Sequence, residues 1–262
     1  MAAYGEPKYV DDLKEKFGAH TDSLLFKENT HIGIDDSFLE GADEFDIAAS
    51  AQVYVEQLIK IVMSKAKHLN DSDNLVYGGG VALNCSANRF LGDYFKNIWI
   101  MPNPGDAGNS LGAAALGFAR KLNWKNAFLG TDIVGVYPVI ETIKALKKDK
   151  IVGIASGRAE FGPRALGTRS LLADPRGPKI KSEVNKIKKR QQFRPFAPII
   201  LEEHASDWFE LPGGLTQSPY MQFVAKCLRP DEIPAVVHGD GTSRVQTVNQ
   251  HQHPELYAAL KK

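Results

Sequence analysis

Residues 74–121, NLVYGGGVALNCSANRFLGDYFKNIWIMPNPGDAGNSLGAAALGFARK, carry the pattern that decides the fold class. Asn74–Tyr77 predicts a short strand that runs into three glycines, and a helix is expected from Val81 to about Leu91. Ile98–Met101 predicts a second strand, followed by a turn rich in proline and glycine. Asn109–Lys121 predicts a helix of small residues, which we expect to pack close to its neighbours. Strands that alternate with helices predict an α/β layer architecture.

On the N-terminal side of this block, a short helix is expected near Pro7–Phe17. A longer helix is expected at Asp43–His68, because this segment begins with acidic residues, has apolar residues at helical spacing and ends with basic ones.

On the C-terminal side, residues 123–138 are expected to be irregular, and a helix follows to Lys150. Ile151–Ala155 predicts a strand that opens a second region, with arginine-rich loops, short strands such as Pro198–Leu201, and turns. We place a domain boundary near residue 140, which gives domains 1–139 and 140–262.

Composition indicates an ordinary globular protein. Of 262 residues, 43% are hydrophobic and 24% charged, and the net charge of +1 indicates no polyanionic partner such as nucleic acid. Two cysteines are too few for a disulfide scaffold. The N-terminus does not have the pattern of a signal peptide, and apolar stretches such as Leu111–Ala119 are too short to span a bilayer. We therefore expect a cytoplasmic protein without a membrane partner.

Two loops in the first region are candidates for binding. Gly78, Gly79 and Gly80 lie between a strand and a helix, where backbone amides can approach a phosphate, although such a loop taken alone is more often a tight turn. Asp106 directly precedes a helix. Its spacing favours a helix cap over a metal ligand.

The densest signal is GRAEFGPRALGTRSLLADPR at residues 157–176. It places Arg158, Arg164, Arg169 and Arg176 in one stretch held by glycine and proline. Arginine binds phosphate or carboxylate through two parallel hydrogen bonds and keeps its charge. This stretch therefore favours an anionic ligand over a solvated surface.

Two further segments contain candidate ligands. Arg194 lies between aromatic residues and prolines at the end of the basic run Lys179–Arg194, whose lysines are expected to be solvated. The segment HGDGTSRVQ, which begins at His238, favours a polar binding loop over a plain turn, because it places an imidazole, a carboxylate, two hydroxyls and a guanidinium close together.

Five stretches together resemble one known family, the O-carbamoyltransferases. They are GGVALNCSANRFL, MPNPGDAGNSLGAA, GRAEFGPRALGTRSLLADPR, FRPFAPIILEE and HGDGTSRVQTV, and they run in this order from Tyr77 to Val248. The family includes the enzymes that carbamoylate nodulation factors, cephamycin and tobramycin. Five motifs in order are more specific than any one of them.

The resemblance implies a fold and a reaction. Residues 1–139 would be the C-terminal half of an actin-like domain, and residues 140–262 an incomplete YrdC-like α/β domain with a twisted mixed sheet. The YrdC-like domain would convert carbamoyl phosphate and ATP into carbamoyl-adenylate. The actin-like domain would then pass the carbamoyl group to a hydroxyl-bearing acceptor, a small molecule or a nucleotide, beside iron or another divalent metal.

The resemblance also implies roles for individual residues. The candidates for catalysis are Arg158, Arg164, Arg169, Arg194 and His238. The candidates for binding ATP or carbamoyl phosphate are Gly78, Gly79, Gly80, Asn84, Arg176, Asp240, Thr242, Ser243 and Arg244. Asp106 matches the metal-ligating aspartate of the family, which reverses the preference for a helix cap.

The sequence departs from the family pattern in three ways. The paired histidines, HxxxH, that supply the other metal ligands are absent, as is the closing Asn-Thr-Ser-Phe-Asn motif. Gly239 and Ser243 replace an expected apolar residue and an alanine. The alternative is therefore an inactive or partner-dependent nucleotide-binding fragment, which a complementary chain would complete. Two other classes are disfavoured: an actin-like kinase by the arginine motif, and an RNA-binding module by the net charge.

Overall fold

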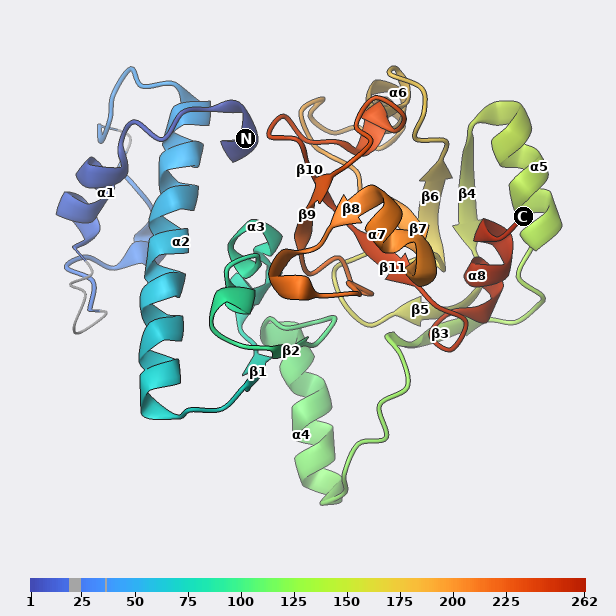
Figure 1. Cartoon of the computed structure of the whole chain (residues 1–262), viewed down its shortest axis with the longest axis horizontal. Helices are drawn as coiled ribbons and strands as arrows, with labels where there is room; N and C mark the ends of the chain where they lie inside the picture. The colour runs from blue at the N-terminus through green and yellow to red at the C-terminus, as the bar shows by residue number, and fades with distance from the viewer. Residues whose placement is uncertain (19–24, 36) are drawn as a thin grey trace.

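The computed structural model describes residues 1–18, 25–35 and 37–262, and shows a mixed α/β fold built from small sheets (Figure 1). The helices are α1 (Val10–Phe17), α2 (Glu44–Leu69), α3 (Cys85–Asn88), α4 (Asn109–Phe118), α5 (Val139–Asp149), α6 (Ile180–Ile187), α7 (Ala205–Trp208) and α8 (Pro254–Leu260). The strands are β1 (Asn74–Tyr77), β2 (Asn97–Ile100), β3 (Phe128–Ile133), β4 (Ile151–Ala155), β5 (Gly157–Glu160), β6 (Arg169–Ala173), β7 (Ile199–Leu201), β8 (Phe209–Glu210), β9 (Val224–Cys227), β10 (Thr242–Arg244) and β11 (Gln246–Val248). No helix in these ranges has both the length and the apolarity needed to cross a bilayer.

Helix α2 is the long helix that was predicted at residues 43–68. Asp43 caps it by accepting a hydrogen bond from the Phe45 N–H at 2.7 Å, and basic residues end it, as the helix dipole favours. Helix α1 packs on α2 through Leu13 and Phe17, which bury against Tyr54. Both predicted helices of the N-terminal segment are therefore confirmed.

Strands β1 and β2 pair in parallel, with Asn74 opposite Asn97 and Tyr77 opposite Ile100. Their apolar side chains join a core that Ile59 and Met63 of α2 supply on one side. Phe223 from the second region completes this core, so burial of apolar surface stabilises the contact between the two regions.

The single helix expected at residues 81–91 is wrong. A 3-10 turn at Gly80–Leu83 precedes the short helix α3, and another 3-10 turn follows at Leu91–Asp93. Asn84 separates the first two, because its side-chain oxygen accepts a hydrogen bond from the Ala87 N–H at 3.1 Å and so starts a new helix.

The helix of small residues is present as α4, but the expectation that it packs closely is wrong. None of its residues is buried, and Leu116 and Phe118 are 84% and 77% exposed. Figure 1 shows α4 projecting away from the rest of the fold. It ends earlier than expected because Ala119 adopts a left-handed conformation, with φ of 49°.

The second region contains several small sheets instead of one twisted sheet. β4 pairs antiparallel with β6, β7 pairs parallel with β11, and β9 lies between β8 and β10. The segment at residues 123–138, which was expected to be irregular, contains β3, which pairs antiparallel with β5. Since β3 lies before residue 140 and β5 after it, a sheet crosses the boundary that the sequence predicts.

Candidate anion-binding site

Several of the sequence motifs meet where the first and second regions touch. The Gly162–Arg164 corner of the arginine motif packs against the backbone of Pro102, which belongs to the proline- and glycine-rich turn. Gly162 has φ of +146°, and a Cβ atom there would lie 2.5 Å from the Pro102 carbonyl oxygen. Glycine is therefore required at this corner both for its conformation and for the close approach.

Arg164, next to this corner, reaches back to the segment that follows the glycine loop. Its Nη2 donates a hydrogen bond to the Leu83 carbonyl oxygen at 3.2 Å, and its side chain is half-buried. Nearby, Asn88 Nδ2 donates to the Gln222 carbonyl oxygen at 2.9 Å, which also links the two regions. Arg164 is therefore held at the junction of the two regions.

Arg244, at the end of β10, is close enough to Arg164 for the two charges to interact. Burial, and then the charge of Arg164, lower the pKa of Arg244 to about 10. An interaction with Cys85 acts on this pKa in the opposite direction, and Nε of Arg244 is buried without a hydrogen-bond partner among the described residues. A buried donor without a partner costs free energy, so this group is suited to a ligand.

Arg190 is the third member, and sequence reasoning missed it. Its charge also lowers the pKa of Arg244. Arg190 Nε donates to Asn185 Oδ1 at 2.6 Å, and the guanidinium lies 4.4 Å from the centre of the Phe196 ring, so its position is fixed. We refer to Arg164, Arg190 and Arg244 as the arginine cluster.

The charges of the arginine cluster are not neutralised within the protein. Among the residues that the structure describes, no carboxylate forms an ion pair with any of the three guanidiniums. Like charges that are partly buried repel one another, and an anion relieves this repulsion. The arrangement is therefore suited to phosphate or carboxylate binding through several guanidinium donors.

Glu160 shapes the loop that carries Arg164. Its Oε1 accepts hydrogen bonds from the N–H groups of Leu166, Thr168 and Arg169 at 2.7, 3.0 and 3.3 Å. Burial alone would raise the pKa of Glu160, but the N–H donors outweigh burial and the pKa is lowered. Glu160 therefore holds the loop as a carboxylate.

The other arginines of the motif contact the protein itself. Arg158 donates to the Leu129 carbonyl oxygen at 2.9 Å. Arg169 donates to four backbone carbonyls, which makes it a support of the loop. Arg176 donates two hydrogen bonds to the Asp174 carboxylate, each of 2.8 Å. These bonds hold the pKa of Asp174 well below its usual range. Arg194 is exposed. Their predicted roles in catalysis and binding stay predictions.

The loop that begins at His238 is organised by its own side chains. Asp240 Oδ1 accepts hydrogen bonds from the Thr242 N–H and hydroxyl at 3.0 and 2.7 Å. His238 Nδ1 lies 3.2 Å from the Thr242 hydroxyl, while its Nε2 is buried without a partner. Burial lowers the pKa of His238 to about 4, against the opposing effect of Asp240. At neutral pH this side chain is therefore an uncharged imidazole.

The two departures from the family pattern in this loop have structural reasons. A Cβ atom at position 239 would lie 2.8 Å from the Ala3 carbonyl oxygen, so Gly239 makes room for the N-terminal segment. Ser243 is fully buried and donates to the Val236 carbonyl oxygen at 2.9 Å. Its hydroxyl is therefore occupied within the protein.

The glycine loop lies open. No atom of a described residue, chain neighbours apart, is within 4 Å of a Cβ built at Gly78, Gly79 or Gly80, so there is space for a ligand beside the loop. The Gly79 N–H, however, donates to the Pro104 carbonyl oxygen at 2.7 Å and is not free to bind phosphate. Asn84 exchanges hydrogen bonds with Gln52 and caps α3.

The predicted metal ligand does not fit a metal site within the described part of the chain. Asp106 is exposed and begins a 3-10 turn without capping it. No three His, Cys, Asp or Glu side chains among the described residues come together in a way that could hold a metal ion. Iron sites use several ligands, so no step of a reaction can be derived through a metal here.

Comparison with known proteins identifies relatives for both regions. The family models described as "Carbamoyltransferase N-terminus" and "Carbamoyltransferase C-terminus" match residues 6–115 and 143–262. The chain is 34% identical to an uncharacterized protein of Synechocystis, in an alignment that covers all of this chain and 54% of that protein. It is 34% identical to nodulation protein NolO of Bradyrhizobium diazoefficiens, over 82% of this chain and 45% of that protein. It is 37% identical to nodulation protein U of Sinorhizobium fredii, over 83% of this chain and 43% of that protein. The chain thus spans about half the length of these curated relatives.

Proposed function

The chain belongs to the carbamoyltransferase family, and we propose that its arginine cluster binds the phosphate of carbamoyl phosphate or of ATP. One observation carries the proposal: Arg164, which lies where the motifs of the two regions meet, is close enough to Arg244 for their charges to interact, and neither forms an ion pair with a carboxylate of the described residues. Arg190 adds a third positive charge. Three guanidiniums can neutralise the charge that moves onto a phosphate as it leaves.

The proposed reaction is the transfer of a carbamoyl group to a hydroxyl. Water would cleave carbamoyl phosphate to carbamate and phosphate, and a carbamate oxygen would attack the α-phosphorus of ATP to give carbamoyl-adenylate with release of pyrophosphate. The acceptor oxygen would then attack the carbamoyl carbon, AMP would leave, and the hydroxyl proton would be lost. The YrdC-like and actin-like assignments of the two regions, the use of ATP and a cytoplasmic location belong to the same proposal. The acceptor class is a hydroxyl-bearing small molecule or nucleotide.

A second candidate function is a nucleotide-binding fragment that depends on a partner. The observations that favour it are the absence of other metal ligands around Asp106, within the described residues, and the bare surface of α4. An exposed apolar helix is typical of a surface that another polypeptide covers. In this case anions would bind to the arginine cluster, but no product would form.

Cys85 provides a direct test of anion binding. Cys85 is partly exposed and close enough to Arg244 to influence its pKa, whereas Cys227 is buried, so a thiol reagent such as Ellman's reagent should modify Cys85 first. We expect inorganic phosphate, carbamoyl phosphate and ATP each to slow this modification, because the bound anion would cover the sulfur. In Arg164→Ala the protection should disappear, while the exposed Arg120→Ala serves as the matched control. If none of the three anions changes the rate in the folded parent chain, the proposal is wrong.

A further inference from the structure

Residues 2–9 form a strap that runs from the first turn of α2 to two loops of the second region (Figure 1). The later half of the strap is held tightly on α2. Asp46 accepts a hydrogen bond from the Glu6 N–H at 2.8 Å. A Cβ atom at Gly5 would overlap the carbonyl group of Phe45, so only glycine fits against the helix at this point. The strap is therefore fixed on the first region.

The earlier half of the strap reaches the second region through Tyr4. Its hydroxyl accepts a hydrogen bond from Lys181 Nζ at 2.8 Å, and a Cβ atom at Gly239 would lie 3.2 Å from its ring. The rings of Tyr4 and Phe45 meet edge-to-face with their centres 6.3 Å apart, and Phe45 meets Phe193 in the same way at 6.0 Å. Tyr4 therefore supports the loop that contains Gly239 directly and the loop that contains Phe193 through one further ring.

Both loops lead to members of the arginine cluster. The loop that contains Gly239 continues into β10, which ends at Arg244. In the other loop, Nδ2 of the buried Asn185 donates to the carbonyl oxygens on the two sides of Phe193, at 3.2 and 3.1 Å. Oδ1 of the same side chain accepts a hydrogen bond from Arg190 Nε at 2.6 Å. A shift of either loop would therefore move a guanidinium of the arginine cluster.

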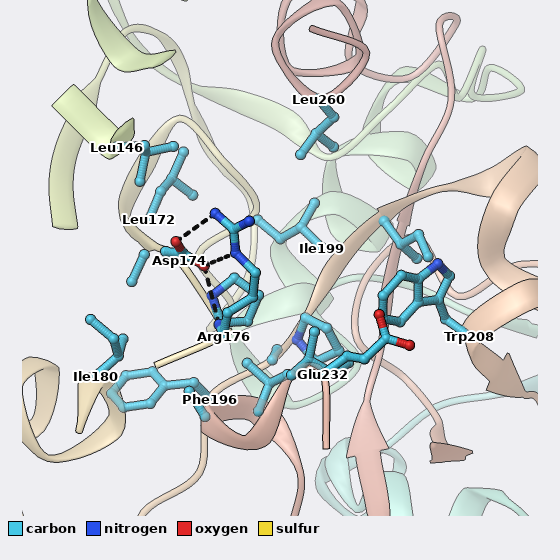
Figure 2. Close-up of a pocket in the computed structure, with 18 of the residues that line it drawn as sticks. Leu146, Leu172, Asp174, Arg176, Ile180, Phe196, Ile199, Trp208, Glu232 and Leu260 are labelled. Carbon is cyan, nitrogen blue, oxygen red and sulfur yellow. Dashed lines mark hydrogen bonds and ion pairs between the residues drawn. The ribbon is translucent and has the colours of Figure 1, made fainter. Parts of the chain in front are cut away.

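The two ends of this chain of contacts are held with different strength. Arg190 lies on the ring of Phe196, which packs with Ile180 of α6 in the wall of a cavity of the second region (Figure 2). Tyr4, in contrast, is 46% exposed. Segments with few buried contacts open more readily than a core does. The contact of the strap with the loops is therefore a part of the arrangement that a ligand can stabilise.

We propose that Tyr4 is a positioning residue of the arginine cluster: its ring keeps the loops of Gly239 and Phe193 in the arrangement that binds a phosphate-bearing anion. Tyr4 acts through these loops and not on the anion itself. If the docked strap favours anion binding, the bound anion favours docking of the strap by the same factor. The inference rests on the proposed anion binding at the arginine cluster, and it makes that binding depend on contact between the two regions.

Calorimetry with carbamoyl phosphate and the full chain provides the first test. We expect Tyr4→Ala to weaken the affinity by about fivefold or more, the lower end of the usual coupling between two sites. Tyr4→Phe should keep the parent affinity because it keeps the ring. Gly239→Ala should act like Tyr4→Ala, because the added Cβ atom would lie 2.8 Å from the Ala3 carbonyl oxygen and displace the strap. Two matched controls should bind as the parent does: Phe118→Ala, which removes an exposed ring, and Gly112→Ala, where the added Cβ atom points into open space.

Hydrogen exchange provides a second readout, which a purely structural role of Tyr4 would not change. The N–H groups of Tyr4 and Gly5 donate hydrogen bonds within the short turn of the strap. Saturating carbamoyl phosphate should slow the exchange of these two amides in the parent chain, by a factor similar to the loss of affinity in Tyr4→Ala. In Tyr4→Ala, the Gly5 amide should respond much less to the anion.

The outcomes separate this inference from the proposed function. No binding of carbamoyl phosphate by the folded parent chain would overturn both. Binding by the parent that is unchanged in Tyr4→Ala and Gly239→Ala, each shown by circular dichroism to be folded, would overturn the positioning role alone. Two further results would do the same: Tyr4→Phe that binds as weakly as Tyr4→Ala, which would contradict the role of the ring, and exchange at Tyr4 and Gly5 that the anion does not change.

Discussion

Arg164 donates a hydrogen bond to the carbonyl oxygen of Leu83 at 3.2 Å, although the two residues lie 81 positions apart. This contact joins the arginine motif to the segment that follows the glycine loop. Two residues after Leu83, Cys85 is close enough to Arg244 to influence its pKa. The contacts therefore place residues from three separate motifs around one group of positive charges, and they explain why a ligand at this point would involve both regions of the chain.

The first prediction concerns Arg164. We expect Arg164→Ala to weaken binding of carbamoyl phosphate by about 2–5 kcal/mol, the range for one partner removed from a buried charge pair. The affinity of Arg164→Lys for carbamoyl phosphate should fall between those of the parent chain and Arg164→Ala, because lysine keeps the charge but loses the planar fork of donors. Isothermal titration calorimetry measures both. Unchanged affinity in a folded Arg164→Ala protein would exclude this residue from the binding site.

The second prediction concerns Glu160 as a positioning residue for Arg164. Glu160→Gln keeps one acceptor oxygen but loses the carboxylate charge that accepts three N–H groups, so we expect the free energy of unfolding to fall by about 1–3 kcal/mol. Because the loop carries Arg164, affinity for carbamoyl phosphate should fall as well. Urea denaturation and calorimetry give the two values. The exposed Glu141→Gln is the control, and a loss of stability with full affinity would limit Glu160 to a structural role.

Local sequence signals predicted the elements whose contacts are local. The bounds of β1 and α2 agree with the sequence to within a residue, because an apolar run and an N-cap at Asp43 define them. β3 was missed because its partner, β5, lies after residue 140, and strand pairing over such a distance leaves no local pattern. The break at Asn84 was missed because the sequence does not show whether this side chain continues a helix or starts a new one. In the structure it starts a new one, by accepting a hydrogen bond from the Ala87 N–H.

The site could be predicted in part. The sequence identified Arg164 and Arg244 as candidate ligands, and the structure brings these two together. It did not identify Arg190, because the basic run that contains this residue is typical of a solvated helix face. One signal was available: Phe196 follows six residues later, and the guanidinium stacks on that ring. Cys85 carried no signal, because only the fold brings it close enough to Arg244 to influence its pKa.

The third prediction concerns pH. His238 has a pKa of about 4 in the folded chain and a usual value near 6.5 when unfolded. Between these values the unfolded chain binds the extra proton, so the free energy of unfolding should fall as the pH falls from about 6.5 to 4, by at most about 1.4 kcal/mol per pH unit from this group. Burial also lowers the pKa of His253, which acts in the same direction.

Urea denaturation at several pH values between 7.5 and 4.5 measures this slope. We expect His238→Gln to reduce the slope, because glutamine does not titrate in this range. His204→Gln, at an exposed position, should leave it unchanged. An identical slope in the parent and in His238→Gln would mean that the imidazole is solvated and titrates normally.

The fourth prediction concerns iron. Asp106 supplies one carboxylate, and the described residues provide no further ligands around it. We therefore expect the purified chain to contain much less than one iron per molecule, and Asp106→Asn to leave the content unchanged. Elemental analysis after mild purification measures this. Stoichiometric iron that is lost in Asp106→Asn would reveal further ligands. The first to examine would be His31, which is exposed, and His20, which lies outside the described residues.

The last prediction is that this chain alone does not complete carbamoyl transfer. The acceptor hydroxyl has a high pKa, so it needs a metal or a base to become a nucleophile. Among the described residues no metal-ligand group exists, and His238, the candidate base, has its Nε2 buried in the protein. The unpaired edges of β6 and β7 also leave the second region without a continuous sheet.

An assay with carbamoyl phosphate, ATP and several hydroxyl acceptors should follow pyrophosphate and carbamoylated product separately. We expect no product, and product in good yield from this chain alone would show that its own residues activate the acceptor. Pyrophosphate without product would mean that the second region forms the adenylate and that only the transfer step needs a partner. An Arg164→Ala control separates that result from background hydrolysis, because pyrophosphate formed at the arginine cluster should disappear in this variant.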